Sequence, residues 1–146
     1  MRVMAVDYGD ARTGIAVSDE SASLAGEAWV IEEKNMDTVA RITASEAVVR
    51  NARVIVVGYP RNMNGSVGPR AEKSEQLADL LRSQCEKCDI EIVLWDERMT
   101  TMSAHRILTD TGRHGKKRKK TVDAVAASLI LESYLRYINQ ETGSRE

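Results

Sequence analysis

The chain has 146 residues, of which 42% are hydrophobic and 29% charged, and its formal net charge is −1. This composition is typical of a globular protein with one core. No apolar run approaches the ~20 residues that a transmembrane helix needs, and Met1 and Arg2 lead directly into a strand-like segment without a signal peptide. We therefore expect a cytoplasmic protein with a single domain over residues 1–138 and a disordered C-terminal tail over residues 139–146.

The first part of the chain predicts three strands and a helix. Apolar runs at Val3–Val6 and Thr13–Ser18 flank the turn-forming residues 8–12, which is typical of a hairpin. A third strand is expected at Ala28–Ile31. Asp37 follows at a position where its side chain would cap a helix that continues to about residue 51.

The second part alternates strands and helices. The β-branched run Val54–Gly58 is typical of a strand covered on both faces, and residues 61–68 form a loop over its carboxyl end. Pro69 opens an amphipathic helix, and a fifth strand at 90–95 precedes a short helix at 101–108. The last helix is expected to begin at Thr121. Its apolar positions have helical spacing and are Val122, Val125, Ala126 and Leu129.

This order of elements, βββαβαβαα, predicts an α/β fold. Three antiparallel strands followed by right-handed crossovers into parallel strands give a mixed five-stranded sheet flanked by helices. Ligands bind such sheets in the crevice at the carboxyl ends of the strands.

Three acidic residues lie beside apolar stretches where a strand ends or a helix begins. They are Asp7, Glu97 and Asp123. Asp7 and Glu97 follow strands, and Asp123 is expected in the first turn of the last helix, where the helix dipole favours negative charge. Clustered carboxylates repel one another unless a cation intervenes, and their hard oxygens suit Mg²⁺ or Mn²⁺. The pattern predicts a metal site that acts on phosphate esters. Simpler interpretations stay open: Asp123 as a helix-stabilising acid and Asp7 as a turn acid.

A basic segment precedes Asp123. Between Arg98 and Lys120 there are eight basic residues and a single acid, Asp110, although the whole chain is nearly neutral. We expect residues 113–120 to form a mobile loop that contacts backbone phosphates and orders on binding. A solvated basic loop without a partner is the alternative. The contacting residues would be Lys116, Lys117, Arg118, Lys119 and Lys120.

Arg98, Thr100 and Thr101 follow Glu97 at the expected start of a helix. A guanidinium binds phosphate in bidentate fashion, and hydroxyl groups at a helix start hold phosphate or simply cap the helix. Cys85 and Cys88 superficially match a redox or half-zinc motif. They close a helix rather than open one and lack a second ligand pair, so we interpret them as an incidental reduced pair.

Together these motifs resemble the bacterial YqgF (RuvX) family over nearly the whole chain. The resemblance implies a ribonuclease H-like fold related to Holliday junction resolvases. It also implies a nuclease that matures the 5′ end of the 16S ribosomal RNA precursor, with junction resolution as the alternative. The motifs are Val6–Gly9, Thr13–Asp19, Val56–Pro60, Asn64–Ser66, Asp96–Thr101, Lys116–Lys120 and Val122–Ala127.

The family's acidic positions correspond to Asp7, Glu97 and Asp123, which the resemblance makes catalytic metal ligands. Asp10, Asp19 and Asp96 remain alternatives for a fourth carboxylate. The expected partners are structured RNA, favoured over DNA junctions, and ribosomal precursor particles, with no membrane. Because nothing in the sequence marks the interface that a junction resolvase needs, we expect a monomer or weak homodimer.

Two other classes of function remain open. The spacing of Asp7, Gly9 and Gly14 also resembles the first phosphate loop of actin-like kinases, but those proteins use two such domains. A non-catalytic RNA-binding factor of ribosome assembly would keep the fold without the chemistry. Metal-dependent cleavage distinguishes the nuclease from both.

Overall fold

The computed structural model of the chain describes residues 1–62, 64–96 and 115–144, except the side chains of residues 115–122 and 141–144. The helix expected at residues 101–108 lies outside these ranges. The described elements are β1 (Arg2–Asp7), β2 (Thr13–Ser18), β3 (Ala25–Ile31), α1 (Met36–Val49), β4 (Ala52–Tyr59), α2 (Pro69–Gln84), β5 (Glu91–Asp96) and α4 (Gly115–Ser144).

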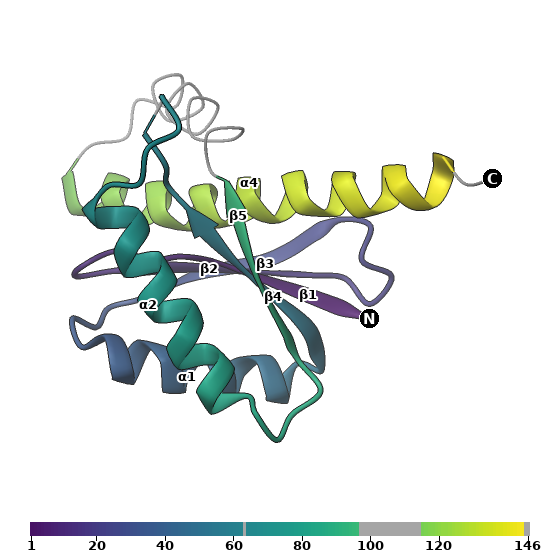
Figure 1. Cartoon of the computed structure of the whole chain (residues 1–146), viewed down its shortest axis with the longest axis horizontal. Coiled ribbons are helices and arrows are strands. Elements are labelled where there is room, and N and C mark those ends of the chain that lie inside the picture. Colours follow the sequence, from purple (N-terminus) through teal and green to yellow (C-terminus); the bar gives the residue numbers. More distant parts are fainter. Residues whose placement is uncertain (63, 97–114, 145–146) are drawn as a thin grey trace.

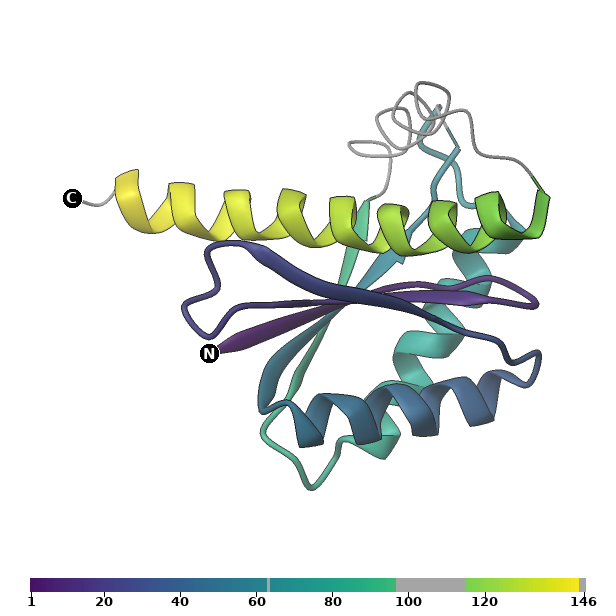
Figure 2. The ribbon, with the colours of Figure 1, turned by 180° about the vertical axis from the view of Figure 1, so that it is seen from behind.

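The strands form a five-stranded mixed sheet in the order β3-β2-β1-β4-β5. The pairs β1–β2 and β2–β3 are antiparallel, whereas β4 runs parallel to both β1 and β5. Helix α4 lies along one face of the sheet, and α1 and α2 cover the other face (Figure 1). The same layers are seen from behind in Figure 2. The predicted mixed sheet flanked by helices is therefore confirmed.

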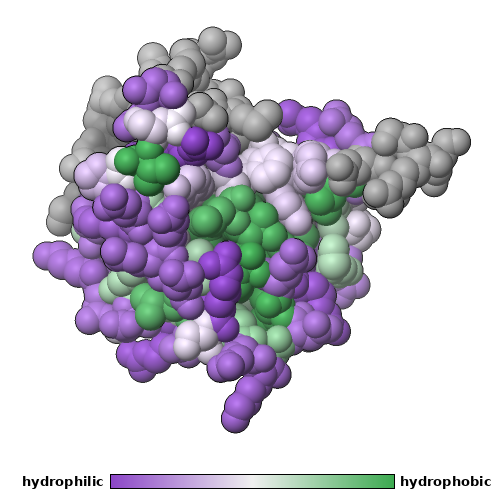
Figure 3. All heavy atoms as spheres, in the orientation of Figure 1, coloured by the Kyte–Doolittle hydropathy of each residue, from purple (hydrophilic) through white to green (hydrophobic). Residues whose placement is uncertain are grey.

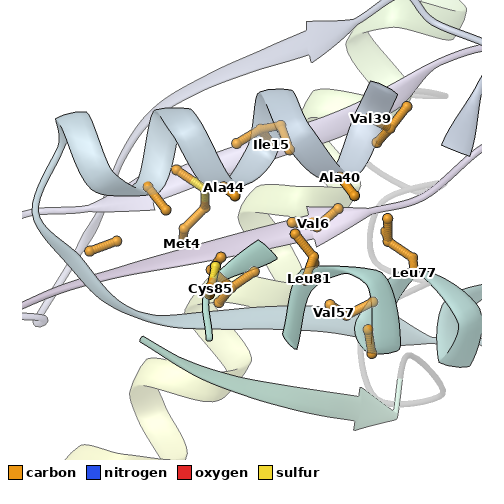
Figure 4. Close-up of a cluster of buried hydrophobic side chains, with 14 of the residues drawn as sticks. Met4, Val6, Ile15, Val39, Ala40, Ala44, Val57, Leu77, Leu81 and Cys85 are labelled. Carbon is orange, nitrogen blue, oxygen red and sulfur yellow. The ribbon is translucent and has the colours of Figure 1, made fainter. Parts of the chain in front are cut away.

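The sheet separates two apolar clusters, and β1 contributes to both. Met4 and Val6 pack with Leu77 and Leu81 of α2 in the first cluster, shown in Figure 4. Val3 and Ala5 point to the other face and join a second cluster under α4. Because both faces of β1 and β4 are covered, their residues are apolar without alternation. Because β1 is packed on both faces, Asp7 at its end is held in a fixed position.

Helix α1 begins two residues earlier than expected, and the predicted cap was wrong. The side chain of Asn35, not Asp37, accepts a hydrogen bond from the backbone N–H of Thr38 at 3.0 Å. Asp37 lies within the first turn, where its charge is favourable to the helix dipole.

Replacing Asn35 with alanine is expected to reduce the free energy of unfolding by about 1 kcal/mol, because an orphan N–H of the first turn loses its acceptor. Asp37→Ala should have a smaller effect, since Asp37 acts only through the dipole. Chemical denaturation of the two variants measures the difference. Equal destabilisation by both would contradict Asn35 as the cap.

Helix α4 is longer than expected at both ends. It begins at Gly115 rather than Thr121, so the segment predicted as a loop is helical from Gly115 onward, and it continues to Ser144 through most of the expected disordered tail. Lys and Arg are good helix formers, and a basic run at a helix start needs no apolar spacing. The predicted apolar positions were also shifted: Val125, Ala126 and Leu129 are only partly buried. The residues that pack on the sheet are instead Ala127, Ile130, Leu131 and Leu135.

Strand β5 forms one edge of the sheet, and its residues are only partly buried apart from the exposed Glu91. Apolar side chains come to the surface in the middle of the face shown in Figure 3. Trp95 connects this strand to α4: its indole N–H donates to Ser133 Oγ at 3.1 Å, and its ring packs edge-to-face on Tyr134 at 5.4 Å. The carboxyl end of β5 is thereby held against α4. None of the helices in the described ranges has the length and apolar character that crossing a membrane requires.

Candidate active site

The parallel strands β1, β4 and β5 direct their carboxyl ends to one edge of the sheet. Asp7 ends β1, and Tyr59 of β4 pairs in register with Asp96, which ends β5. The β1–β2 turn, the first residues of α2 and the beginning of α4 lie at the same end of the molecule (Figures 1 and 2). This is the edge where the sequence predicts the carboxylate site.

Asp7 is a buried carboxylate, with only 8% of its surface exposed. It is paired across the β1–β2 ladder with Gly14. A carboxylate at the end of a central strand is desolvated and has little conformational freedom. It is therefore suited to a ligand role rather than to a solvated turn, the simpler interpretation of its sequence position.

Gly14 brings α4 onto the sheet beside Asp7. A Cβ on Gly14 would lie 2.6 Å from the carbonyl carbon of Asp123 and closer still to its oxygen. Only a residue without a side chain admits the helix backbone at this distance. Since Gly14 is the partner of Asp7 in the ladder, the same contact places Asp7 and Asp123 at one location.

Asp123 is half-buried, and burial raises the pKa of its carboxyl group above the usual range, while Arg12 and Arg70 oppose this rise. The prediction that Asp123 lies in the first helical turn was wrong, because α4 begins at Gly115. The helix dipole therefore does not explain its placement. Instead, an acid lies on the sheet-facing part of a long helix, where it is partly desolvated, and this weakens the interpretation of Asp123 as a helix-stabilising acid.

Glu97, Arg98, Thr100 and Thr101 lie outside the described residues, as does Arg113. Lys116–Lys120 form the helical beginning of α4, with their side chains outside the description. Within the described ranges no three acidic, histidine or cysteine side chains come together as a metal site. The structure thus brings the backbone of Asp123 beside the strand pair that carries Asp7, and the ligand roles of Asp7, Glu97 and Asp123 stay predictions.

The three alternatives for a fourth carboxylate are at different places. Asp19 lies beyond the opposite end of β2, where its carboxylate accepts hydrogen bonds from the backbone of Ser23 and Leu24. Asp10 is largely exposed in the β1–β2 turn and pairs with Lys73 at 2.6 Å. Asp96 is half-buried at the carboxyl edge. Asp10 and Asp96 are both at this edge, and the partial burial of Asp96 favours it over the exposed, lysine-paired Asp10.

Cys85 and Cys88 are both free, and Cys85 is buried in the first apolar cluster. Burial raises the pKa of the Cys85 thiol. Reactive cysteines have a lowered pKa and partial exposure instead. The environment of Cys85 agrees with the interpretation of an incidental pair.

Sequence reasoning missed the basic side chains on the other side of the site. Arg12 lies in the β1–β2 turn, Arg61 follows β4, and Arg70 is in the first turn of α2. The guanidinium of Arg61 donates to the carbonyl of Gly65, and its Nε is buried without a hydrogen-bond partner among the described residues. These arginines come from separate elements, so no local cluster in the sequence marked them.

Comparison with known proteins agrees with this fold. Fowlpox virus resolvase, solved with Holliday junction DNA, superimposes with a TM-score of 0.60 at 13% identity and covers 94% of this chain and 99% of its own. Thermus thermophilus RuvC, solved with a Holliday junction substrate, gives a TM-score of 0.57 at 13% identity, with 94% and 96% covered. At these identities the likeness establishes the ribonuclease H-like fold alone.

Sequence relatives are much closer. A protein of Halothermothrix orenii, named as a candidate pre-16S rRNA nuclease, is 40% identical over 143 residues, covering 98% of this chain and 100% of the relative. A protein of Caldanaerobacter subterraneus subsp. tengcongensis with the same name is 42% identical over 138 residues, covering 92% and 96%. The model of the RuvX family, described as Holliday junction resolvase, matches residues 1–137.

The fold, the carboxylates at its edge and these relatives define a nuclease of the ribonuclease H-like class. The chain belongs to the RuvX family. The resemblance on which the sequence analysis relied is confirmed.

Proposed function

We propose that this protein is a cytoplasmic, Mg²⁺- or Mn²⁺-dependent nuclease that hydrolyses phosphodiester bonds in the 5′-end maturation of the 16S ribosomal RNA precursor. The observation that carries the proposal is the contact at Gly14, which joins Asp7 and Asp123 from opposite ends of the chain. The names of the relatives support the RNA substrate. We further propose that it acts as a monomer or weak homodimer on precursor particles.

The described residues fit a divalent cation. Asp7 is buried and Asp123 is half-buried, so both carboxylates have lost much of the water that would stabilise their charge. Carboxylate oxygens are the ligands that Mg²⁺ and Mn²⁺ take, and a cation relieves the repulsion between them. Asp7, Asp123 and, in our proposal, Glu97 would hold the ion. When bound, it would activate a water molecule and stabilise the leaving oxygen of the phosphodiester.

The chain's own residues have three tasks in this proposal. The carboxylates stay fixed because β1 and α4 are anchored in the core. The hydrogen bond from Trp95 to Ser133 holds the carboxyl end of β5 against α4. Glu97 is two residues after Trp95 in the chain. Arg98, Thr100 and Thr101 orient the reacting phosphate. The basic start of α4, Lys116–Lys120, binds the phosphates beside it.

DNA junction cleavage is the second candidate, and the description of the family model favours it. A resolvase cuts two opposed strands and therefore needs two sites related by symmetry. Symmetric paired cuts and a dimer in solution would be its signatures.

A cleavage panel tests the proposal. Purified protein with Mn²⁺ is expected to shorten precursor 16S RNA at its 5′ side, and EDTA should abolish this reaction. Single-stranded RNA and four-way DNA junctions serve as the comparison substrates. Preferential, paired cutting of the junction would replace RNA maturation by junction resolution. Tight binding without cleavage of any substrate would overturn the nuclease proposal in favour of an assembly factor.

A further inference from the structure

Two arginines lie at the end of the sheet that carries Asp7 and Asp123, one in the β1–β2 turn and one at the start of α2. Arg12 ends the turn, two residues before Gly14, against which the backbone of Asp123 packs. Arg70 is the second residue of α2, three residues before Lys73, whose ammonium group donates to Asp10 of the β1–β2 turn. Neither arginine is part of a predicted motif for metal or phosphate binding.

Some basic side chains already have a carboxylate partner and others do not. Several arginines and a lysine elsewhere on the surface are paired with a carboxylate: Arg2, Arg50, Arg53, Lys73 and Arg82. In the described ranges, Lys34, Arg41, Arg61, Lys87 and Arg136 lack one as well as Arg12 and Arg70, so what singles out Arg12 and Arg70 is their position at the site. Arg70 is exposed and Arg12 is partly exposed, so an external anion can reach both. Their positive charge is available for a ligand.

The two segments that carry these arginines are fixed relative to each other. Gly9 is required in the turn because a Cβ there would overlap the carbonyl oxygen of Arg12. Lys73 of α2 donates to Asp10 of the same turn at 2.6 Å. On the other side of α2, Tyr59 donates to Glu75, also at 2.6 Å. Exposed contacts of this kind add little stability, but they set the spacing between the turn and the first turn of α2.

We propose that Arg12 and Arg70 form a second phosphate-binding site for the nucleic-acid backbone, at the same end of the sheet as Asp7 and Asp123. Arginine suits this role because its planar guanidinium binds two phosphate oxygens at once. The backbone of Lys116–Lys120 lies about 5–10 Å along the helix axis from Asp123. A nucleic-acid strand bound by these arginines would lie at the end of the sheet that carries Asp7 and Asp123. The inference rests on the proposed nuclease function and adds the positioning residues.

Binding can be measured separately from cleavage. A short labelled single-stranded RNA is titrated in EDTA over a range of salt concentrations with Arg12→Ala, Arg70→Ala and the double variant. Each lost phosphate contact should reduce the slope of log K against log salt by about 0.7, equally for different RNA sequences. The matched control is Arg82→Ala, which removes one arginine from the other end of α2, where it is paired with Asp79. It should leave the slope unchanged.

The cleavage assay gives a second measurement. With Mn²⁺, the double variant should raise KM more than it lowers kcat, and Arg12→Lys with Arg70→Lys should restore the salt slope but only part of the affinity. A double variant that matches the wild-type slope would overturn the second site. So would a double variant that melts at a lower temperature but binds normally, since the arginines would then only compensate the charge of Asp123. If the slope falls but wild-type protein cuts nothing, the binding site stands and the nuclease proposal fails.

Discussion

Asp7→Asn is expected to reduce cleavage by at least about a hundredfold, because loss of a partner that merely orients a metal ligand already costs about 10- to 100-fold. Asparagine keeps the size of the buried side chain but removes its charge and one of its ligand oxygens. RNA affinity in EDTA should change little, since Asp7 contacts no phosphate in our proposal. Single-turnover cleavage with Mn²⁺ and titration without metal separate these two effects.

The control for Asp7 is Asp79→Asn on α2, which neutralises an exposed carboxylate paired with Arg82. It should cleave like wild type. Asp123→Asn should lose activity as Asp7→Asn does. Full activity of either site variant would remove that residue from the metal ligands.

Asp123→Asn also gives a pH-dependent stability result. Burial raises the folded-state pKa of Asp123, so its ionised form destabilises the fold at pH values above that raised pKa. In EDTA at neutral pH, the variant should therefore melt at the same temperature as wild type or higher. The difference should vanish in acid, where the wild-type carboxyl group is protonated in both states. Melting curves of Asp123→Asn and wild type at neutral and acid pH test the sign of this difference in melting temperature.

Gly14→Ala is expected to be the most disruptive small substitution in the sheet. Its Cβ would lie 2.6 Å from the carbonyl carbon of Asp123, so α4 must move away from β2 or the strand must bend. Overpacking of this kind costs about 1–3 kcal/mol and more where backbone meets backbone. Since the displaced residue is Asp123 itself, cleavage should fall together with the melting temperature.

Gly26→Ala in β3 is the matched control. Its nearest neighbour would be the carbonyl oxygen of Val17 at 3.1 Å, a tight contact that a small shift relieves. It should melt slightly below wild type and retain full activity. Should Gly14→Ala fold and cleave as well as Gly26→Ala, the approach of α4 at Gly14 would not be what positions Asp123.

The strands were predictable because their burial determines their composition. Val54–Gly58 could be recognised as a strand from its uninterrupted β-branched residues, which follow from coverage of β4 on both faces. The start of α4 was not predictable in the same way. Apolar spacing reports only the part of a helix that contacts a core, and the basic residues before Thr121 carry no such spacing. Charge alone does not separate a loop from an exposed helical turn.

The sequence indicated the positions of Asp7 and Asp123 but not the residues around them. Asp7 was marked by the strand that it ends, and Asp123 by the apolar helix around it. The role of Gly14 depends on register and on the approach of a helix more than a hundred residues later, neither of which a local pattern contains. Arg12 and Arg70 are far apart in the sequence, and only the connection from β4 to α2 brings α2 next to the β1–β2 turn. Glu97, the third ligand expected from the sequence, stays a prediction.

The contact between Gly14 and Asp123 joins an early and a late part of the chain, so the site can form only late in synthesis. Asp7 is among the first residues translated, whereas Asp123 belongs to the final helix. At about 5–20 residues per second, the second carboxylate follows the first by on the order of 10 s. Until α4 has left the ribosome and packed on β2, the nascent chain lacks Asp123, one of the three carboxylates proposed as metal ligands. An enzyme made in contact with ribosomal RNA would thus be unable to cut it before its own translation is complete.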